Sequence, residues 1–165
     1  MKKIKLLMLS ICCLTAFSAI AQDYKIENNE VKTAASIQFK TGTAELLPSS
    51  DAALQSIKKY LDDKTYITLL RVEAHTSNSG DGAANQLLSE KRADAVCEKL
   101  VSLGVNCNRL LPVGFGGHKP IATNSTPEGK AQNMRISFVN AKLKDRAIGN
   151  MPVDGGGKVV GNACK

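Results

Sequence analysis

The chain has 165 residues, of which 43% are hydrophobic, and its 22 basic and 15 acidic side chains give a formal net charge of +7. This length suffices for one domain with its own hydrophobic core and excludes a long series of domains. The excess of positive charge is mild, so a nucleic-acid partner is not expected.

Residues 1–21 have the three parts of a secretory signal peptide. Three lysines in the first five residues precede the apolar run LLMLSICCLTAFSAI, and the small-residue sequence AIA ends at Ala21. The run is short for a membrane span, and lipidation at Cys12 is not expected because the large Ile11 precedes it. Cleavage would remove three lysines and no acids, lowering the net charge from +7 to about +4. We therefore expect a periplasmic chain without a transmembrane segment.

The first half of the remaining chain predicts a strand, a helix and a second strand. Residues 22–33 are polar and are expected to form a short leader before a strand at residues 34–39. Apolar residues recur at helical spacing over residues 49–63, and Ser49, Ser50 and Asp51 are alternative N-caps. Residues 65–75 are rich in β-formers and predict a strand that is partly buried on both faces.

The second half begins with a long amphipathic helix from about Ala83, which Gly104 ends. Strands are expected at residues 109–116 and 133–139, with a long polar loop between them. The tail at residues 141–165 contains three consecutive glycines and is expected to be flexible. The order predicts an α/β fold: a βαβαββ two-layer sandwich in which helices pack on one face of a small mixed sheet.

Three cysteines follow the signal peptide and would face an oxidising compartment. Cys97 lies on the long helix and Cys107 just beyond its end, so a bridge between them is the favoured one of three pairings. The alternative is two unpaired thiols, with Cys97 in the core, because sequence does not fix connectivity. Cys164 is then left over. No cysteine or histidine spacing predicts a metal site.

A glycine-rich polar loop leads from the second strand into the long helix, and such a helix start favours anions. Asn85, Ser89 and Arg92 are spaced four and then three residues apart, which predicts one helix face. Arg92 there could hold a carboxylate through two parallel hydrogen bonds. Helix spacing alone favours the alternative, in which Arg92 forms a surface ion pair.

Five segments resemble, in order, those of the OmpA-like peptidoglycan-binding domain: FKTGTAELLP, EAHTSNSGDGAANQLLSEKRADAV, LVSLGV, VGFGGHKP and TPEGKAQNMR. The similarity runs from about Ala34 to Asn140, which sets the expected domain at residues 34–140. The resemblance implies the βαβαββ fold and noncovalent binding of the peptidoglycan stem peptide at its diaminopimelate residue. It implies no cofactor.

The resemblance also implies a set of binding residues, with two departures. In the family, an aspartate after the loop threonine receives the diaminopimelate ammonium, and an arginine of the helix receives its carboxylate. The arginine is Arg92, but the aspartate position holds Ser77, and Met134 replaces an arginine of the family. The implied peptidoglycan-binding residues are Thr76, Ser77, Asn85, Arg92, Asn133 and Arg135.

Ser77 offers a hydroxyl and no negative charge to the ligand ammonium. Hydrogen bonds to charged groups contribute roughly 1.5–3 kcal/mol, so the affinity would fall on the order of 10–100-fold. Asp81, four residues further along the loop, could replace the missing acid or could instead cap the long helix.

Other residues indicate no chemistry. His75 and His118 lack partners at the spacing of a metal site or a catalytic triad. The sequence GFGGHKP has no helix after it, which excludes a phosphate-binding loop. An envelope hydrolase is therefore not favoured.

Two interpretations remain. The first is a non-enzymatic cell-envelope protein that binds peptidoglycan and is associated with the wall or the outer membrane. The second is a scaffold that keeps the fold, has lost the ligand and interacts with other envelope proteins. Both share one fold, so the fold does not separate them.

Overall fold

Three strands form the centre of the sheet in the computed structural model, which describes residues 24–149 and 152–164. They are β3 (Ile67–His75), β4 (Leu110–Gly116) and β5 (Ile136–Leu143). Strand β3 pairs in parallel with β4 and antiparallel with β5. The full order is β1-β2-β5-β3-β4-β7, with β6 paired to β5. The predicted small mixed sheet is confirmed.

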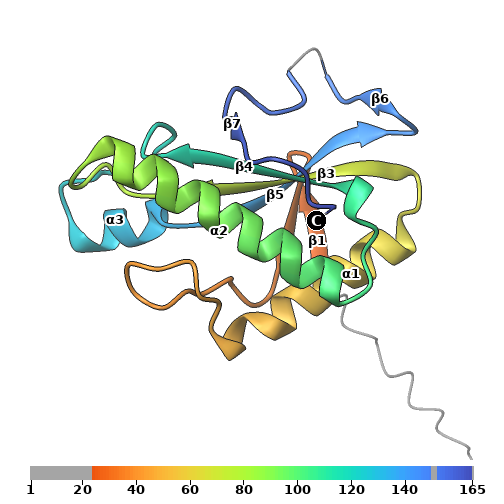
Figure 1. Ribbon diagram of the computed structural model, residues 1–165, viewed down its shortest axis with the longest axis horizontal. Coiled ribbons are helices and arrows are strands. Elements are labelled where there is room, and N and C mark those ends of the chain that lie inside the picture. The colour runs from red at the N-terminus through yellow and green to blue at the C-terminus, as the bar shows by residue number, and fades with distance from the viewer. Residues whose placement is uncertain (1–23, 150–151, 165) are drawn as a thin grey trace, which may run out of the picture.

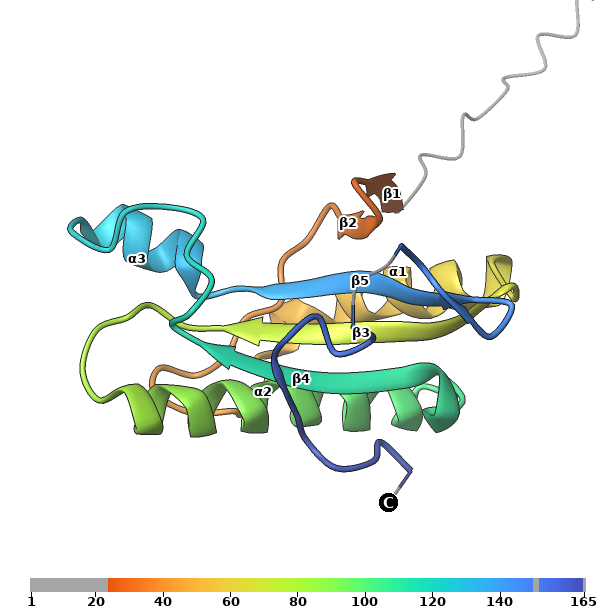
Figure 2. The same ribbon diagram turned by 90° about the horizontal axis from the view of Figure 1, so that it is seen from above.

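Two helices, α1 (Asp51–Asp63) and α2 (Gly82–Ser102), pack on one face of this sheet (Figures 1 and 2). Alternation along β3 turns Leu70 and Val72 into the core between the layers. Helix α2 lies very close to β4, because a Cβ atom at Gly114 would lie 2.8 Å from the backbone nitrogen of Glu90. The two-layer α/β architecture follows from these contacts.

The stretch expected as a leader is part of the fold. Strands β1 (Tyr24–Glu27) and β2 (Glu30–Thr33) form an antiparallel hairpin, and β2 pairs with β5. The Tyr24 hydroxyl donates to Asp63 at 2.9 Å, and the Tyr24 ring packs edge-on against Tyr60 of α1. These contacts hold the segment against α1 although its sequence is polar, so it belongs to the domain and is not a separate leader.

The expected strand at residues 34–39 is absent from the described structure. Only an isolated bridge joins Phe39 to Leu46 there, because β2 occupies the place beside β5 instead. Val31 of β2 fills the core position and is 2% exposed. The short helix η1 (Pro48–Ser50) then leads into α1. The N-cap of α1 is Ser50, whose side chain makes no capping bond.

The long polar loop contains a helix that the sequence interpretation missed. Helix α3 (Pro127–Asn133) begins after Thr126, whose hydroxyl accepts a hydrogen bond from the Gly129 backbone at 3.1 Å. Threonine followed by proline at the first helical position is a helix-start signal. With seven residues, α3 is too short to be identified from the spacing of its apolar residues.

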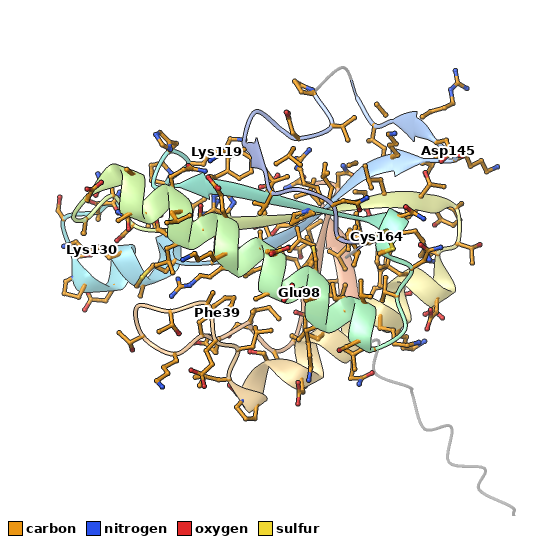
Figure 3. The ribbon with its side chains drawn as sticks, in the orientation of Figure 1. Phe39, Glu98, Lys119, Lys130, Asp145 and Cys164 are labelled. Atoms are coloured by element: carbon orange, nitrogen blue, oxygen red, sulfur yellow. A yellow bond between two sulfur atoms is a disulfide. The ribbon has the colours of Figure 1, made fainter. Side chains whose placement is uncertain are left out.

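The disulfide joins Cys107 to Cys164, so the predicted Cys97–Cys107 bridge is wrong. Cys97 faces the core from α2, with none of its surface exposed, and takes no part in the bridge. Cys107 lies in the short helix η2 (Cys107–Arg109), which follows α2. Figure 3 shows Cys164 near η2. Because the Cys97 side chain faces the core, its sulfur cannot reach the thiol of Cys107 in η2.

The C-terminal segment is held against the sheet and is not a free tail in the described residues. After β6 (Arg146–Ala147), strand β7 (Lys158–Val159) pairs with β4. Figure 2 shows the segment crossing β3 and β4. Gly157 packs on Val113 and Phe115, whose side chains lie on the sheet face opposite the helices, and Ala163 enters the core. The disulfide fixes its end.

Candidate ligand-binding recess

The loop between β3 and α2 is held by hydrogen bonds at both ends. The backbone N–H of Thr76 donates to the Gly116 carbonyl at 2.8 Å. Asp81 is the N-cap of α2, and its carboxylate accepts from the N–H groups of Ala83 and Ala84. The Asn85 amide donates to the Ser79 carbonyl at 2.7 Å. Asp81 therefore takes the capping role, and Asn85 fastens the loop to the helix.

Arg92 is buried on α2 and has no acidic partner in the part of the chain that the structure describes. It is 8% exposed, and its Nε–H donates to the Thr43 carbonyl at 2.9 Å. Its guanidinium carbon lies 4.8 Å from the centre of the Phe39 ring (Phe39 is labelled beside α2 in Figure 3). No ion pair joins Arg92 to an acid within residues 24–149 and 152–164. The alternative of a surface ion pair is therefore wrong.

The Arg92 guanidinium opens onto a small cavity at the end of the sheet, here named the arginine recess. Its volume is about 10 Å³, roughly the space of one water molecule. A ligand would therefore displace lining side chains. Burial lowers the pKa of the Arg92 guanidinium, which still stays charged at neutral pH. The recess is lined by Ile37, Phe39, His75, Arg92, Met134, Arg135 and Ile136.

Arg135 brings a second guanidinium to the arginine recess. It donates to the Lys119 carbonyl through both terminal nitrogens, at 3.2 and 3.3 Å. Burial lowers the pKa of Arg135, and the nearby Glu30 and Glu73 oppose that shift. The two cations predicted for the site, Arg92 and Arg135, thus meet at one cavity.

His75 lines the arginine recess and was missed as a site residue by the sequence interpretation. Its ring is stacked on Phe115 with centroids 5.0 Å apart, and only 1% of the residue is exposed. Nε2 lies 3.2 Å from Glu73 Oε2, and Glu73 Oε1 lies 2.6 Å from Arg71 Nε. The alternation of Arg71, Glu73 and His75 along β3 is the signal that could have found this row, because the three share one face.

Opposing effects set the charges of this row. Burial raises the pKa of Glu73, but hydrogen bonds and the charges of His75 and Arg71 outweigh it, so the pKa lies below its ordinary value. Burial is the largest cause that lowers the pKa of His75, and its bond to Glu73 opposes it. A neutral imidazole therefore faces an ionised carboxylate.

The remaining predicted residues have unequal roles. Asn133 is fully buried and makes four hydrogen bonds to the segment 121–124, so it positions the loop and has no capacity left for a ligand. Thr76 and Ser77 are 4% and 8% exposed. The Thr76 hydroxyl is buried without a hydrogen-bond partner among the described residues.

Residues 24–149 and 152–164 contain no group of three or more histidine, cysteine or acidic side chains placed to hold a metal ion. Among these residues no helix has both the length and the apolar composition of a membrane span. The signal-peptide prediction at residues 1–21 lies outside them.

Two known proteins are similar to this chain in sequence. Outer membrane porin F of Pseudomonas aeruginosa is 36% identical over 117 residues, which cover 69% of this chain and 33% of the porin. The peptidoglycan-binding protein ArfA of Mycobacterium tuberculosis is 34% identical over 107 residues, 65% of this chain and 32% of ArfA. This chain spans less than half the length of the first curated relatives that it matches.

A solved structure extends the comparison. The crystal structure of the peptidoglycan-associated lipoprotein from Burkholderia pseudomallei superimposes with a TM-score of 0.56 at 28% identity, covering 64% of this chain and 86% of the lipoprotein chain. The model of the OmpA family matches residues 38–134, more than half of the sequence. The chain belongs to the OmpA family.

Proposed function

We propose that this protein binds peptidoglycan noncovalently, with Arg92 receiving the carboxylate of the diaminopimelate residue of the stem peptide. The observation that carries the proposal is the burial of Arg92 without an acidic partner among the described residues. A buried charge without a counter-ion is costly, and such costs gather at binding sites. A ligand carboxylate would supply the missing charge.

The geometry of Arg92 suits this role. Thr43 and Phe39 hold the Nε side and one face of the guanidinium, which leaves both terminal nitrogens without a partner among the described residues. These nitrogens present parallel N–H groups, the arrangement that matches a carboxylate. A lysine would bring the charge without the fork. Arg135 adds a second positive charge at the same recess.

The relatives support the same ligand class. ArfA is named for peptidoglycan binding, and the lipoprotein of Burkholderia pseudomallei for its association with peptidoglycan. We further propose that residues 1–21 are a signal peptide and that residues 34–140 correspond to the family domain. The location would be the periplasm, at the wall or the inner face of the outer membrane.

The test is sedimentation of the purified protein with wall sacculi. The parent protein is expected to cosediment, and Arg92→Lys is expected to reduce the bound fraction at least about 10-fold, because one bidentate charge-assisted contact is lost. Arg146→Lys is the matched control, since Arg146 is exposed on β6. Equal binding by Arg92→Lys and the parent would contradict the role of Arg92.

A second candidate function is a scaffold that interacts with envelope proteins and has no wall ligand. Ser77 favours it, because a hydroxyl stands where the family aspartate would meet the ligand ammonium. In that case the parent protein does not cosediment with sacculi, whereas Ser77→Asp does. Cosedimentation of the parent rejects this candidate.

A further inference from the structure

The arginine recess carries positive charge that no nearby acid is free to balance. Arg92 and Arg135 both line it. Lys119 adds a third cation close by, because its Nζ lies 4.1 Å from the centre of the Phe115 ring on which His75 is stacked. The charges of Arg135 and Lys119 both reach His75.

The acids of this region already have partners. Both carboxylate oxygens of Glu73 are occupied, one by Arg71 at 2.6 Å and the other by His75 at 3.2 Å. The Asp81 carboxylate accepts two backbone N–H groups at the start of α2, the shorter at 2.6 Å. Glu30, whose charge reaches Arg135, is paired with Lys32 at 2.6 Å. A ligand that enters the recess therefore meets cations with no uncommitted acid beside them among the described residues.

Neutral hydrogen-bond acceptors are present instead. Because the ionised Glu73 can only accept, His75 must carry its proton on Nε2, which leaves Nδ1 as an acceptor. Nδ1 is buried and has no hydrogen-bond partner among the described residues. The Thr76 hydroxyl is also buried without a hydrogen-bond partner among the described residues. Ser77, the next residue, has another buried hydroxyl. His75 lines the recess, and Thr76 and Ser77 follow it directly in the chain. A buried polar atom without a partner on a lining residue indicates a polar ligand.

We propose that the recess selects a carboxylate whose neighbouring nitrogen is acylated over one whose neighbouring nitrogen is a free ammonium. This inference rests on the proposed function and names the chemical form of the wall residue that is bound. An ammonium would add a positive charge beside two guanidiniums, and like charges brought together in a site reject a ligand. An amide N–H is neutral and needs only a neutral acceptor.

Two parts of the wall have this chemistry. One is a diamino acid whose side-chain amine has been acylated by a cross-link, with its adjacent carboxylate free. The other is the C-terminal residue of a peptide, whose carboxylate stands next to a peptide N–H. Both present a carboxylate for Arg92 and a neutral N–H for the acceptors.

Isothermal titration of the full purified protein with four synthetic probes tests the proposal. The probes are a stem tripeptide ending in diaminopimelate in which every carboxylate except that of the diaminopimelate side chain is amidated, the same tripeptide with its side-chain amine acetylated, N-acetyl-D-alanyl-D-alanine, and free D-alanine. The acetylated tripeptide is expected to bind at least about 10-fold more tightly than the unmodified one. The dipeptide separates the sources: strong binding by it identifies a peptide terminus, and weak binding identifies the cross-link.

The outcomes separate this inference from the proposed function. Equal or tighter binding of the unmodified tripeptide overturns the inference, while cosedimentation with sacculi keeps the proposed function. If none of the probes binds and sacculi do not sediment the protein, the proposed function fails and the inference fails with it. If none of the probes binds but the protein cosediments with sacculi, the inference fails and the proposed function stands. These comparisons use the parent protein, so they do not depend on whether the variants fold.

A pair of variants sharpens the test. Ser77→Asp is expected to reverse the preference by at least about 10-fold, because it adds a negative charge at the loop position where the family has its aspartate. Ser49→Asp adds the same charge at an exposed residue of η1 that does not line the recess, and it is expected to keep the parent preference. Circular dichroism shows whether each variant is folded. A folded Ser77→Asp protein with the parent preference contradicts the proposal.

Discussion

Arg71 and Glu73 form a buried ion pair on β3, with Nε and Oε1 2.6 Å apart and both side chains about 10% exposed or less. The pair stands between the C-terminal segment and the arginine recess. Arg71 also donates to the Val153 carbonyl at 2.8 Å, and Glu73 also contacts His75. The strand thus links the segment that covers the sheet to a residue that lines the recess.

Replacement of Glu73 by glutamine should destabilise the protein by about 3 kcal/mol, because breaking a buried pair leaves one charge uncompensated. Urea unfolding of the parent and of Glu73→Gln measures the change in the free energy of unfolding. Glu45→Gln is the control, since the Lys40–Glu45 pair is exposed and should contribute less than about 1 kcal/mol. Equal effects of the two substitutions would contradict the role assigned to the buried pair.

The lowered pKa of His75 predicts that the free energy of unfolding decreases in mild acid. Its pKa in the folded protein lies below the ordinary value of 6.5, so the unfolded chain takes up the proton first. The stabilisation is complete above pH 6.5 and declines as the pH falls toward the folded pKa. His75→Gln should flatten the dependence of the unfolding free energy between about pH 7 and pH 5. An unchanged slope would show that His75 is not its source.

Glu73 acts in the same direction at lower pH. Its folded pKa is depressed, so its stabilisation is present above the ordinary carboxyl pKa of 4.5 and is lost as the pH falls through the folded value. Glu73→Gln removes this contribution. Unfolding curves of the parent, His75→Gln and Glu73→Gln at several pH values separate the two groups.

Thiol counting tests the disulfide. Besides any cysteines of residues 1–21, the unfolded and unreduced protein should show one reactive thiol, from Cys97, and Cys164→Ser should show two. The bridge closes a loop across a separation of 57 residues, so its loss should cost up to about 4 kcal/mol by loop entropy. Cys97→Ser retains the bridge and should show no thiol. Three thiols in the unreduced parent, or none in Cys164→Ser, would contradict the pairing.

Gly114 tests the contact between α2 and β4. A methyl group there would lie 2.7 Å from Glu90 Cγ and 2.8 Å from the Glu90 nitrogen, so Gly114→Ala should destabilise by about 1–3 kcal/mol. Gly82→Ala is the matched control, because nothing lies within 4 Å of its Cβ position. It should be neutral or stabilising by up to about 1 kcal/mol. Thermal unfolding ranks the two variants.

Asp81 separates capping from ligand binding. Asn caps helices about as well as Asp, so Asp81→Asn should keep the stability and, if the acid only caps, the binding to sacculi. Asp81→Ala should lose about 1 kcal/mol of unfolding free energy. Reduced binding by Asp81→Asn at unchanged stability would instead show that the charge serves the ligand.

Helical and strand periodicity gave most of the secondary structure. The run from Ile67 to His75 and the helix that ends near Gly104 have patterns long enough to identify from sequence. Short elements escaped, because β1, β2 and α3 have four to seven residues and are held by tertiary contacts such as the Tyr24–Tyr60 packing. Local patterns do not carry that information.

The site was predictable in part for the same reason. The resemblance placed Arg92 and Arg135 in the site, and the fold brings both to one recess. The resemblance could not show that the Asn133 side-chain amide hydrogen-bonds the neighbouring loop, or that Cys164 forms a disulfide with Cys107. His75 was also missed, because its importance depends on Glu73 and Phe115, which come from two strands. Contacts across strands exist only after folding.

The Cys107–Cys164 bond also determines how the fold would bear mechanical force. Tension applied at Cys164 passes through the sulfur atoms to Cys107, at the connection between α2 and β4. Strand β7, with only two residue pairs to β4, lies inside the covalent ring and carries none of that load. If Arg92 holds the wall as proposed, tension applied at Cys164 would therefore be borne along α2, the longest helix of the described residues.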